Sequence, residues 1–82
     1  MNLDVMLSQG FIKIEGQPIV YKQAGENLVV VYEDRGNGDY QIGDLVVFNK
    51  EGRLSAEEQI LLEREFDAKF GRIAIVWMNI YY

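Results

Sequence analysis

The 82-residue chain contains no cysteine and no histidine. Without cysteine it cannot form disulfide bridges, cysteine-ligated zinc sites or iron–sulfur clusters. Without histidine it lacks the most common general base and the most common metal ligand. It also has no threonine, and its two serines, Ser8 and Ser55, have no imidazole to activate them. We therefore expect a protein that is not an enzyme and that binds no cofactor or metal.

Basic residues are few, and they are scattered along the chain. Eight lysines and arginines stand against thirteen aspartates and glutamates, which gives a net charge of −5. A protein that binds nucleic acid by neutralising phosphates needs lysine and arginine gathered on one face. No two basic residues are adjacent in this sequence. Direct nucleic-acid binding is therefore disfavoured.

Long hydrophobic runs are also missing. The longest unbroken apolar run, Ile73–Met78, is too short to cross a bilayer. The N-terminal segment MNLDVMLSQG lacks the basic start and the long apolar core of a signal peptide. Together with the absence of cysteine, these features predict a cytoplasmic protein that does not associate with membranes.

The residues that are present are typical of a single small globular domain spanning residues 1–82. Hydrophobic residues make up 49% of the chain and charged residues 26%, a balance that disordered chains do not have. Glycines separate the patterned segments, as expected where turns connect regular elements.

Four segments are predicted to be β-strands, because they are rich in β-branched and aromatic residues and are bounded by turn residues. They span residues 11–15, 18–23, 27–34 and 40–49. Asn37-Gly38 is a strong hairpin signal, and the acidic residues around it lack the spacing of an EF-hand. Gly43-Asp44 predicts a bulge in the fourth strand. The short connections predict an antiparallel four-strand meander.

An amphipathic helix is predicted over about residues 55–70. Ser55 can cap its N-terminus, with Glu58 as the reciprocal partner of a capping box, and Gly71 can end it. We expect one side of this helix to lie on the sheet, the side that carries Ala56, Leu62, Phe66 and Phe70. Leu61 falls on a different side, so it is expected to be exposed, under a loop or in an interface.

A second, short helix is predicted near the N-terminus, over residues 3–9. Asn2 can cap its first turn, and Gly10 can end it. A helix of about two turns depends on tertiary contacts for its stability.

The last segment, residues 72–82, is predicted to be a strand that is apolar on both faces, because strand side chains alternate. We expect the helix to cover the face with no polar residue, which carries Ala74, Val76, Met78 and Ile80. The other face is interrupted by Asn79 and is expected to stay open. A strand that is apolar on both faces belongs in a sheet interior, beside the first or third strand. The prediction is thus an α+β fold: the meander, the helix and a final interior strand.

No motif in the chain specifies a reaction or a ligand, so we expect a non-catalytic protein-binding domain. It would act through a sheet face or edge, as a homodimer or as an accessory subunit. The partner-binding candidates are the residues on the expected open face of the final strand, together with the helix residue outside the core pattern. They are Ile73, Ile75, Trp77, Tyr81 and Leu61.

The acidic residues of the predicted helix support an alternative function. The chain would then be a small acidic inhibitor, of the type that phages encode, that blocks a basic nucleic-acid-handling enzyme by imitating nucleic acid. The acidic-surface candidates are Glu57, Glu58, Glu63, Glu65 and Asp67. An ordinary solvated helix face explains the same charges.

Overall fold

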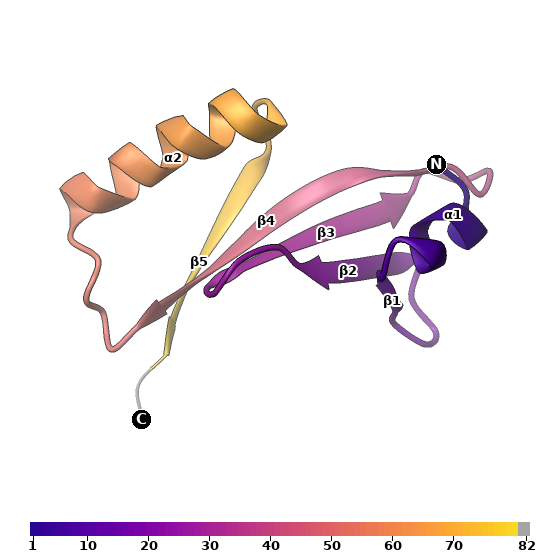
Figure 1. The fold of residues 1–82 in the computed structure, drawn as a ribbon, viewed down its shortest axis with the longest axis horizontal. Helices are drawn as coiled ribbons and strands as arrows, with labels where there is room; N and C mark the ends of the chain where they lie inside the picture. Colours follow the sequence, from indigo (N-terminus) through magenta and orange to yellow (C-terminus); the bar gives the residue numbers. More distant parts are fainter. Residues whose placement is uncertain (81–82) are drawn as a thin grey trace.

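The structure is a computed structural model that describes residues 1–80, and this part of the chain forms two helices and five strands (Figure 1). In chain order they are α1 (Leu3–Ser8), β1 (Ile12–Lys13), β2 (Ile19–Gln23), β3 (Leu28–Asp34), β4 (Tyr40–Lys50), α2 (Ala56–Phe70) and β5 (Ala74–Ile80). The predicted α+β class, the meander and both helices are confirmed. The last two residues of the predicted final strand, 81 and 82, lie outside the described residues.

All five strands form one sheet in the order β1-β2-β3-β4-β5. Strands β1 to β4 pair antiparallel, whereas β5 pairs parallel with β4. The final strand therefore lies at the edge of the sheet, and its predicted interior position beside the first or third strand is wrong. The reason is topological. Sequential hairpins occupy both sides of β3, and the crossover through α2 delivers β5 to the side of β4 that is still free.

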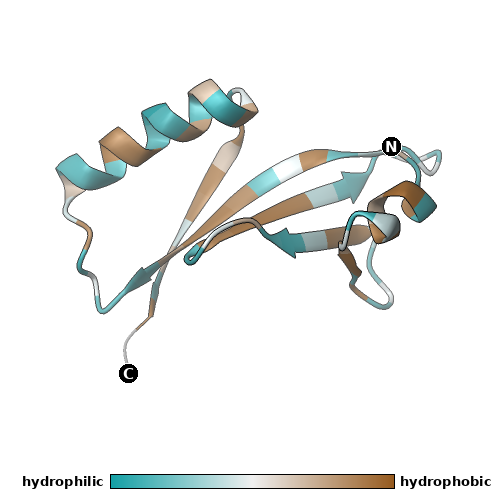
Figure 2. Cartoon of the chain, in the orientation of Figure 1, coloured by the Kyte–Doolittle hydropathy of each residue, from teal (hydrophilic) through white to brown (hydrophobic). Residues whose placement is uncertain are grey.

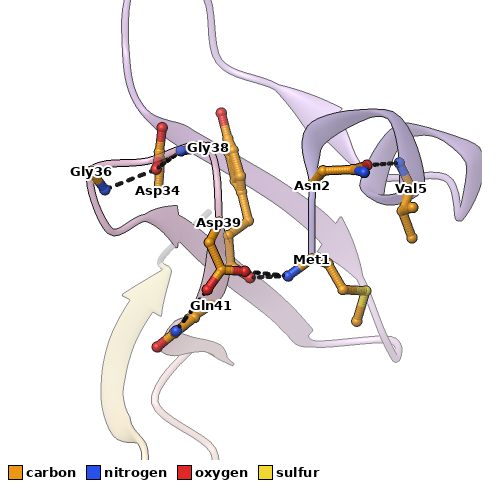
Figure 3. A network of polar contacts seen from close by, with 9 residues as sticks. Met1, Asn2, Val5, Asp34, Gly36, Gly38, Asp39 and Gln41 are labelled. Carbon is orange, nitrogen blue, oxygen red and sulfur yellow. Dashed lines mark hydrogen bonds and ion pairs between the residues drawn. The ribbon is translucent and has the colours of Figure 1, made fainter.

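The predicted bulge in the fourth strand is confirmed. Val31 pairs with Asp44 but the next residue, Tyr32, pairs with Ile42, so Gly43 is the extra residue. The predicted hairpin before it is also confirmed. In that turn the Asp34 Oδ1 atom accepts hydrogen bonds from the N–H groups of residues 36 and 38, at 2.9 and 3.0 Å (Figure 3). This carboxylate therefore organises the turn.

The capping signals correctly locate both helices. The Glu58 N–H donates to the Ser55 Oγ atom at 3.2 Å, and the Ser55 N–H donates back to the Glu58 carboxylate at 3.3 Å. Gly71 ends α2 with φ of 82°, a value that favours glycine. In α1, the Asn2 Oδ1 atom accepts a hydrogen bond from the Val5 N–H at 2.9 Å.

Both helices pack against the same side of the sheet, which we call the helix face. One buried cluster lies beneath α2 and is formed by Leu28, Val30, Leu45 and Val47. Phe66 and Phe70 of α2 pack on this cluster. In the second cluster Met6 of α1 is buried with Val20 of β2. Tyr32 packs against both clusters, so α1 and α2 cover one continuous side.

Asn49 holds the connection from β4 to α2. It is 3% exposed and is the only polar residue classed as buried within residues 1–80. Its Oδ1 atom accepts a hydrogen bond from the Leu54 N–H at 2.9 Å, and its Nδ2 atom lies 3.5 Å from the Leu54 carbonyl oxygen. A buried amide that loses its partner costs about 1–3 kcal/mol. These contacts therefore favour the loop conformation from which α2 starts.

The N-terminus is attached to the start of β4 (Figure 3). The ammonium group of Met1 donates to the Asp39 Oδ1 atom at 2.7 Å and to the Tyr40 carbonyl at 3.0 Å. The Tyr40 N–H donates back to the Met1 carbonyl at 2.7 Å. These contacts place α1 beside the start of β4, at the opposite end of that strand from the connection to α2.

The pKa of the Asp39 carboxyl is lowered from its ordinary value of 3.8, first because the N-terminal ammonium donates a hydrogen bond to it and second because Gln41 does. A pKa that is lower in the folded state gives a stabilisation that is complete above the unfolded value and is lost as the pH falls through the folded value. We expect the urea midpoint to decrease as the pH falls below 3.8. The Asp39→Asn variant should lack that part of the decrease. Identical pH profiles for the two proteins would contradict this attachment.

Candidate interaction surface

The sheet has a second side, which we call the open face. Strand pairing assigns to this side the apolar residues Ile12, Ile19, Tyr21, Val29, Val31, Val46, Phe48, Ala74, Val76, Met78 and Ile80 and the polar residues Gln23, Glu33, Gln41, Asp44 and Lys50. Both helices lie on the helix face, and no helix or strand within residues 1–80 covers the open face. Figure 2 shows the apolar colouring that runs along β3, β4 and β5. One side of this sheet therefore has a largely apolar surface without a covering layer, with its polar residues towards the strand ends and at Asp44.

The two sides of β5 are the reverse of the prediction. Ile75 and Trp77 pack against the cluster beneath α2, whereas Val76 and Met78 are 43% and 46% exposed. The prediction failed because it treated Asn79 as the mark of an open face. Asn79 pairs in register with the buried Asn49 near the end of the covered side. A single amide at the end of a strand does not determine which face is covered.

The predicted binding candidates do not form one surface. Ile73, Ile75 and Trp77 pack against the core cluster. Leu61 lies on α2 and is 59% exposed. Tyr81 lies outside the described residues. A role for any of them in partner binding stays a prediction, and for Trp77 it would require a partner that reaches the helix side of the sheet.

Sequence reasoning missed the residues at the centre of the open face. Val29 of β3 pairs with Val46 of β4, while Val31 pairs with Asp44, and Phe48 follows Val46 on the same side of β4. The signal was present, because residues 28–32 and 45–48 are apolar at consecutive positions and must place apolar side chains on both sides of a sheet. The strand predicted over residues 27–34 is itself apolar on both faces, but the prediction inferred an uncovered surface only for the last strand.

Charged residues lie at the two ends of the β4–β5 pairing on the open face. Asp44 lies in register with Ala74, and Lys50 lies in register with Ile80. Asp44 is half-buried and Lys50 is exposed. Neither side chain takes part in an ion pair within the described residues. The open face thus carries a negative charge where this pairing begins and a positive charge where it ends.

The outer edge of β5 is also unprotected. Within residues 1–80, β5 pairs only with β4, and its seven residues include no charge, proline or glycine. The opposite edge of the sheet is β1, which is only two residues long. Proteins normally shorten or charge such edges, because an unpaired strand is a template for another chain. The apolar open face therefore continues to an edge that can accept a further strand.

The two helices cover the helix face incompletely. No residue of α2 is fully buried. A groove of about 390 Å³ separates the N-terminal half of α2 from the ends of β3 and β4, and Leu28, Asn49 and Leu62 are among its lining residues. A second groove of about 410 Å³ lies beside Phe70 and includes Phe11. These grooves are gaps in a covering layer that the open face lacks entirely.

The acidic candidates are distributed around α2. Glu57, Glu58, Glu63 and Glu65 are exposed, and Asp67 is half-buried. At about 100° per residue, position 65 faces away from positions 63 and 67, and position 57 lies between positions 65 and 67. The Glu58 carboxylate already accepts the capping hydrogen bond. Their role as a recognition surface stays a prediction.

Comparisons with protein-family models, with curated proteins and with solved structures give no match. Within residues 1–80, no three acidic side chains are grouped so that they could hold a metal ion. No helix in the same range is long and apolar enough to pass through a membrane. The open face is thus the feature that the physical chemistry singles out.

Adjacent residues on β5 provide a test of which side is covered. We expect Trp77→Glu to lower the free energy of unfolding by about 3 kcal/mol or more, because it removes a packed aromatic ring and places a charge in the core. Met78→Glu should change it by less than about 0.5 kcal/mol in dilute solution, since Met78 faces solvent. Urea denaturation measures both. A larger loss for Met78→Glu would show that the sides are assigned incorrectly.

Proposed function

We propose that this chain is a non-catalytic protein-binding domain that binds through the open face of its sheet. The single observation that carries the proposal is the absence, within residues 1–80, of any layer over this apolar side. Monomeric proteins rarely leave a contiguous apolar patch of several hundred Å² exposed, and larger patches mark interaction sites. The layer can come from a second copy, or from another protein to which this chain is an accessory subunit.

The arrangement of the open face supports this proposal. Val46, Phe48, Val76 and Met78 occupy neighbouring positions on β4 and β5, and charged residues lie only towards the ends of this apolar region. An apolar centre with a polar rim is the usual organisation of a protein interface. The free edge of β5 adds unpaired backbone groups that can bind an extended segment. A cytoplasmic location is part of the proposal and is supported by the absence of cysteine.

A second candidate is the acidic inhibitor of a basic nucleic-acid-handling enzyme. It is favoured by the exposure of four of the five candidate acids on α2, and the net charge of −5 would attract a basic target. The capping role of Glu58 and the spread of the acids around the helix count against it. The two candidates use different surfaces, so they can be separated by mutation and by salt.

The test compares what the tagged protein captures from a cell extract with what two variants capture. Met78→Glu should abolish capture, because it places a charge in the open face, and Leu61→Glu should not, although it also replaces an exposed apolar residue. Capture should persist at high salt, since apolar contacts are not screened.

Two other outcomes contradict this binding mode. Loss of capture with Leu61→Glu but not with Met78→Glu would place the binding surface on α2. Capture that disappears at high salt and in a Glu57→Lys, Glu65→Lys variant would favour the acidic inhibitor.

A further inference from the structure

We propose that the open face binds a second copy of this chain, with the two β4 strands antiparallel across the interface. This inference rests on the proposed function, because it names the partner of the same surface. In this arrangement, the two-fold axis lies between the two sheets and runs perpendicular to β4 and β5. It is level with the row of the sheet in which Val47 pairs with Trp77. Two sheets packed in this way form a small sandwich in which β4 and β5 of each copy cover the same strands of the other.

The apolar residues that β4 and β5 place on the open face are arranged symmetrically about this row. On β4, Val46 and Phe48 lie one residue to either side of position 47, so Val46 of one copy faces Phe48 of the other. On β5, Val76 and Met78 lie one residue to either side of position 77 and face each other in the same way. A two-fold interface requires such self-complementarity. No change of register is needed between the two strands.

The charges at the two ends of the β4–β5 pairing are arranged symmetrically about the same row. Asp44 and Lys50 lie three residues to either side of position 47. The axis therefore places Asp44 of one copy near Lys50 of the second copy, twice in each dimer. A two-fold axis parallel to the strands would instead bring Lys50 to Lys50 and Asp44 to Asp44. Such like-charge contacts cost free energy, so the charges select the antiparallel arrangement.

The available area suits a weak dimer. The axis places residues 44–50 of β4 and 74–80 of β5 over the same strands of the second copy, whereas β3 reaches this row only at Leu28 and extends away from it. Each strand residue covers roughly 16 Å² of a sheet face, given a spacing of about 4.8 Å and a rise of about 3.3 Å. The flat area that overlaps is then roughly 220 Å² per copy and roughly 450 Å² for the pair. Stable interfaces bury about 1,200–2,000 Å² of accessible surface, so we expect a dissociation constant on the order of millimolar.

A charge exchange tests this arrangement on the intact chain. Lys50→Glu and Asp44→Lys should each weaken self-association by about tenfold or more, because each homodimer then contains two like-charge contacts. An equimolar mixture of the two variants should associate almost as tightly as the native protein, since the carboxylate introduced at position 50 of one variant then faces the ammonium introduced at position 44 of the other. Sedimentation velocity over a concentration series measures the constants, and native mass spectrometry identifies the mixed dimer.

Controls separate the interface from folding and from net charge. Lys69→Glu changes the charge by the same amount as Lys50→Glu, but on an exposed position of α2, and it should leave self-association unchanged. Circular dichroism and urea unfolding establish that each variant is folded. If Asp44→Lys fails to fold, Val46→Glu replaces it, and this variant should be monomeric alone.

The outcomes distinguish this inference from the proposed function. A native protein that stays monomeric up to millimolar concentration overturns the inference. If Met78→Glu still abolishes capture from the extract in that case, the open face binds a different protein and the proposed function holds. If Met78→Glu has no effect there either, both fail. If neither Lys50→Glu nor Asp44→Lys changes the strength of self-association, the antiparallel arrangement is wrong.

Discussion

The pairing of β4 on both of its edges determines the rest of the structure. On one side it continues the antiparallel meander through β3, and on the other it aligns β5 in parallel through seven consecutive residue pairs. Its alternating side chains then define the two faces, with Leu45 and Val47 beneath α2 and Val46 and Phe48 on the uncovered side. Because both sets are apolar, a strand that builds the core also creates a surface that water solvates poorly.

Both helices of the described residues lie on the same side of the sheet. Residues 1–80 contain only two helices, and both lie on the helix face, one over each buried cluster. A domain of this size buries only about 60–65% of the surface that its unfolded chain exposes. The residues that the structure describes use both of their helices on one side of the sheet, and the second side is left exposed to solvent or to a partner.

Local signals in the sequence predicted the elements well, and long-range relations poorly. The capping box at Ser55 and Glu58, the turn before β4 and the bulge at Gly43 depend on neighbouring residues, and each is present in the structure. The edge position of β5 depends on which strand side is still free, and hairpin order alone decides that. Which side of β5 is covered depends on the side of the sheet over which α2 crosses, and the single polar residue Asn79 does not indicate that side. The open face was visible in the two-sided apolar patterns of β3 and β4, but only their pairing unites them into one surface.

We therefore expect the open face to be covered in solution at the concentrations where the protein acts. The most direct measurement is the relaxation of methyl NMR signals by a soluble paramagnetic agent, recorded over a range of protein concentrations. The methyl groups of Val46, Val76 and Met78 should become protected as the concentration rises, while those of Leu61, which is exposed on α2, stay accessible. Equal relaxation of the Val46, Val76 and Met78 methyls at every concentration would contradict a covered open face.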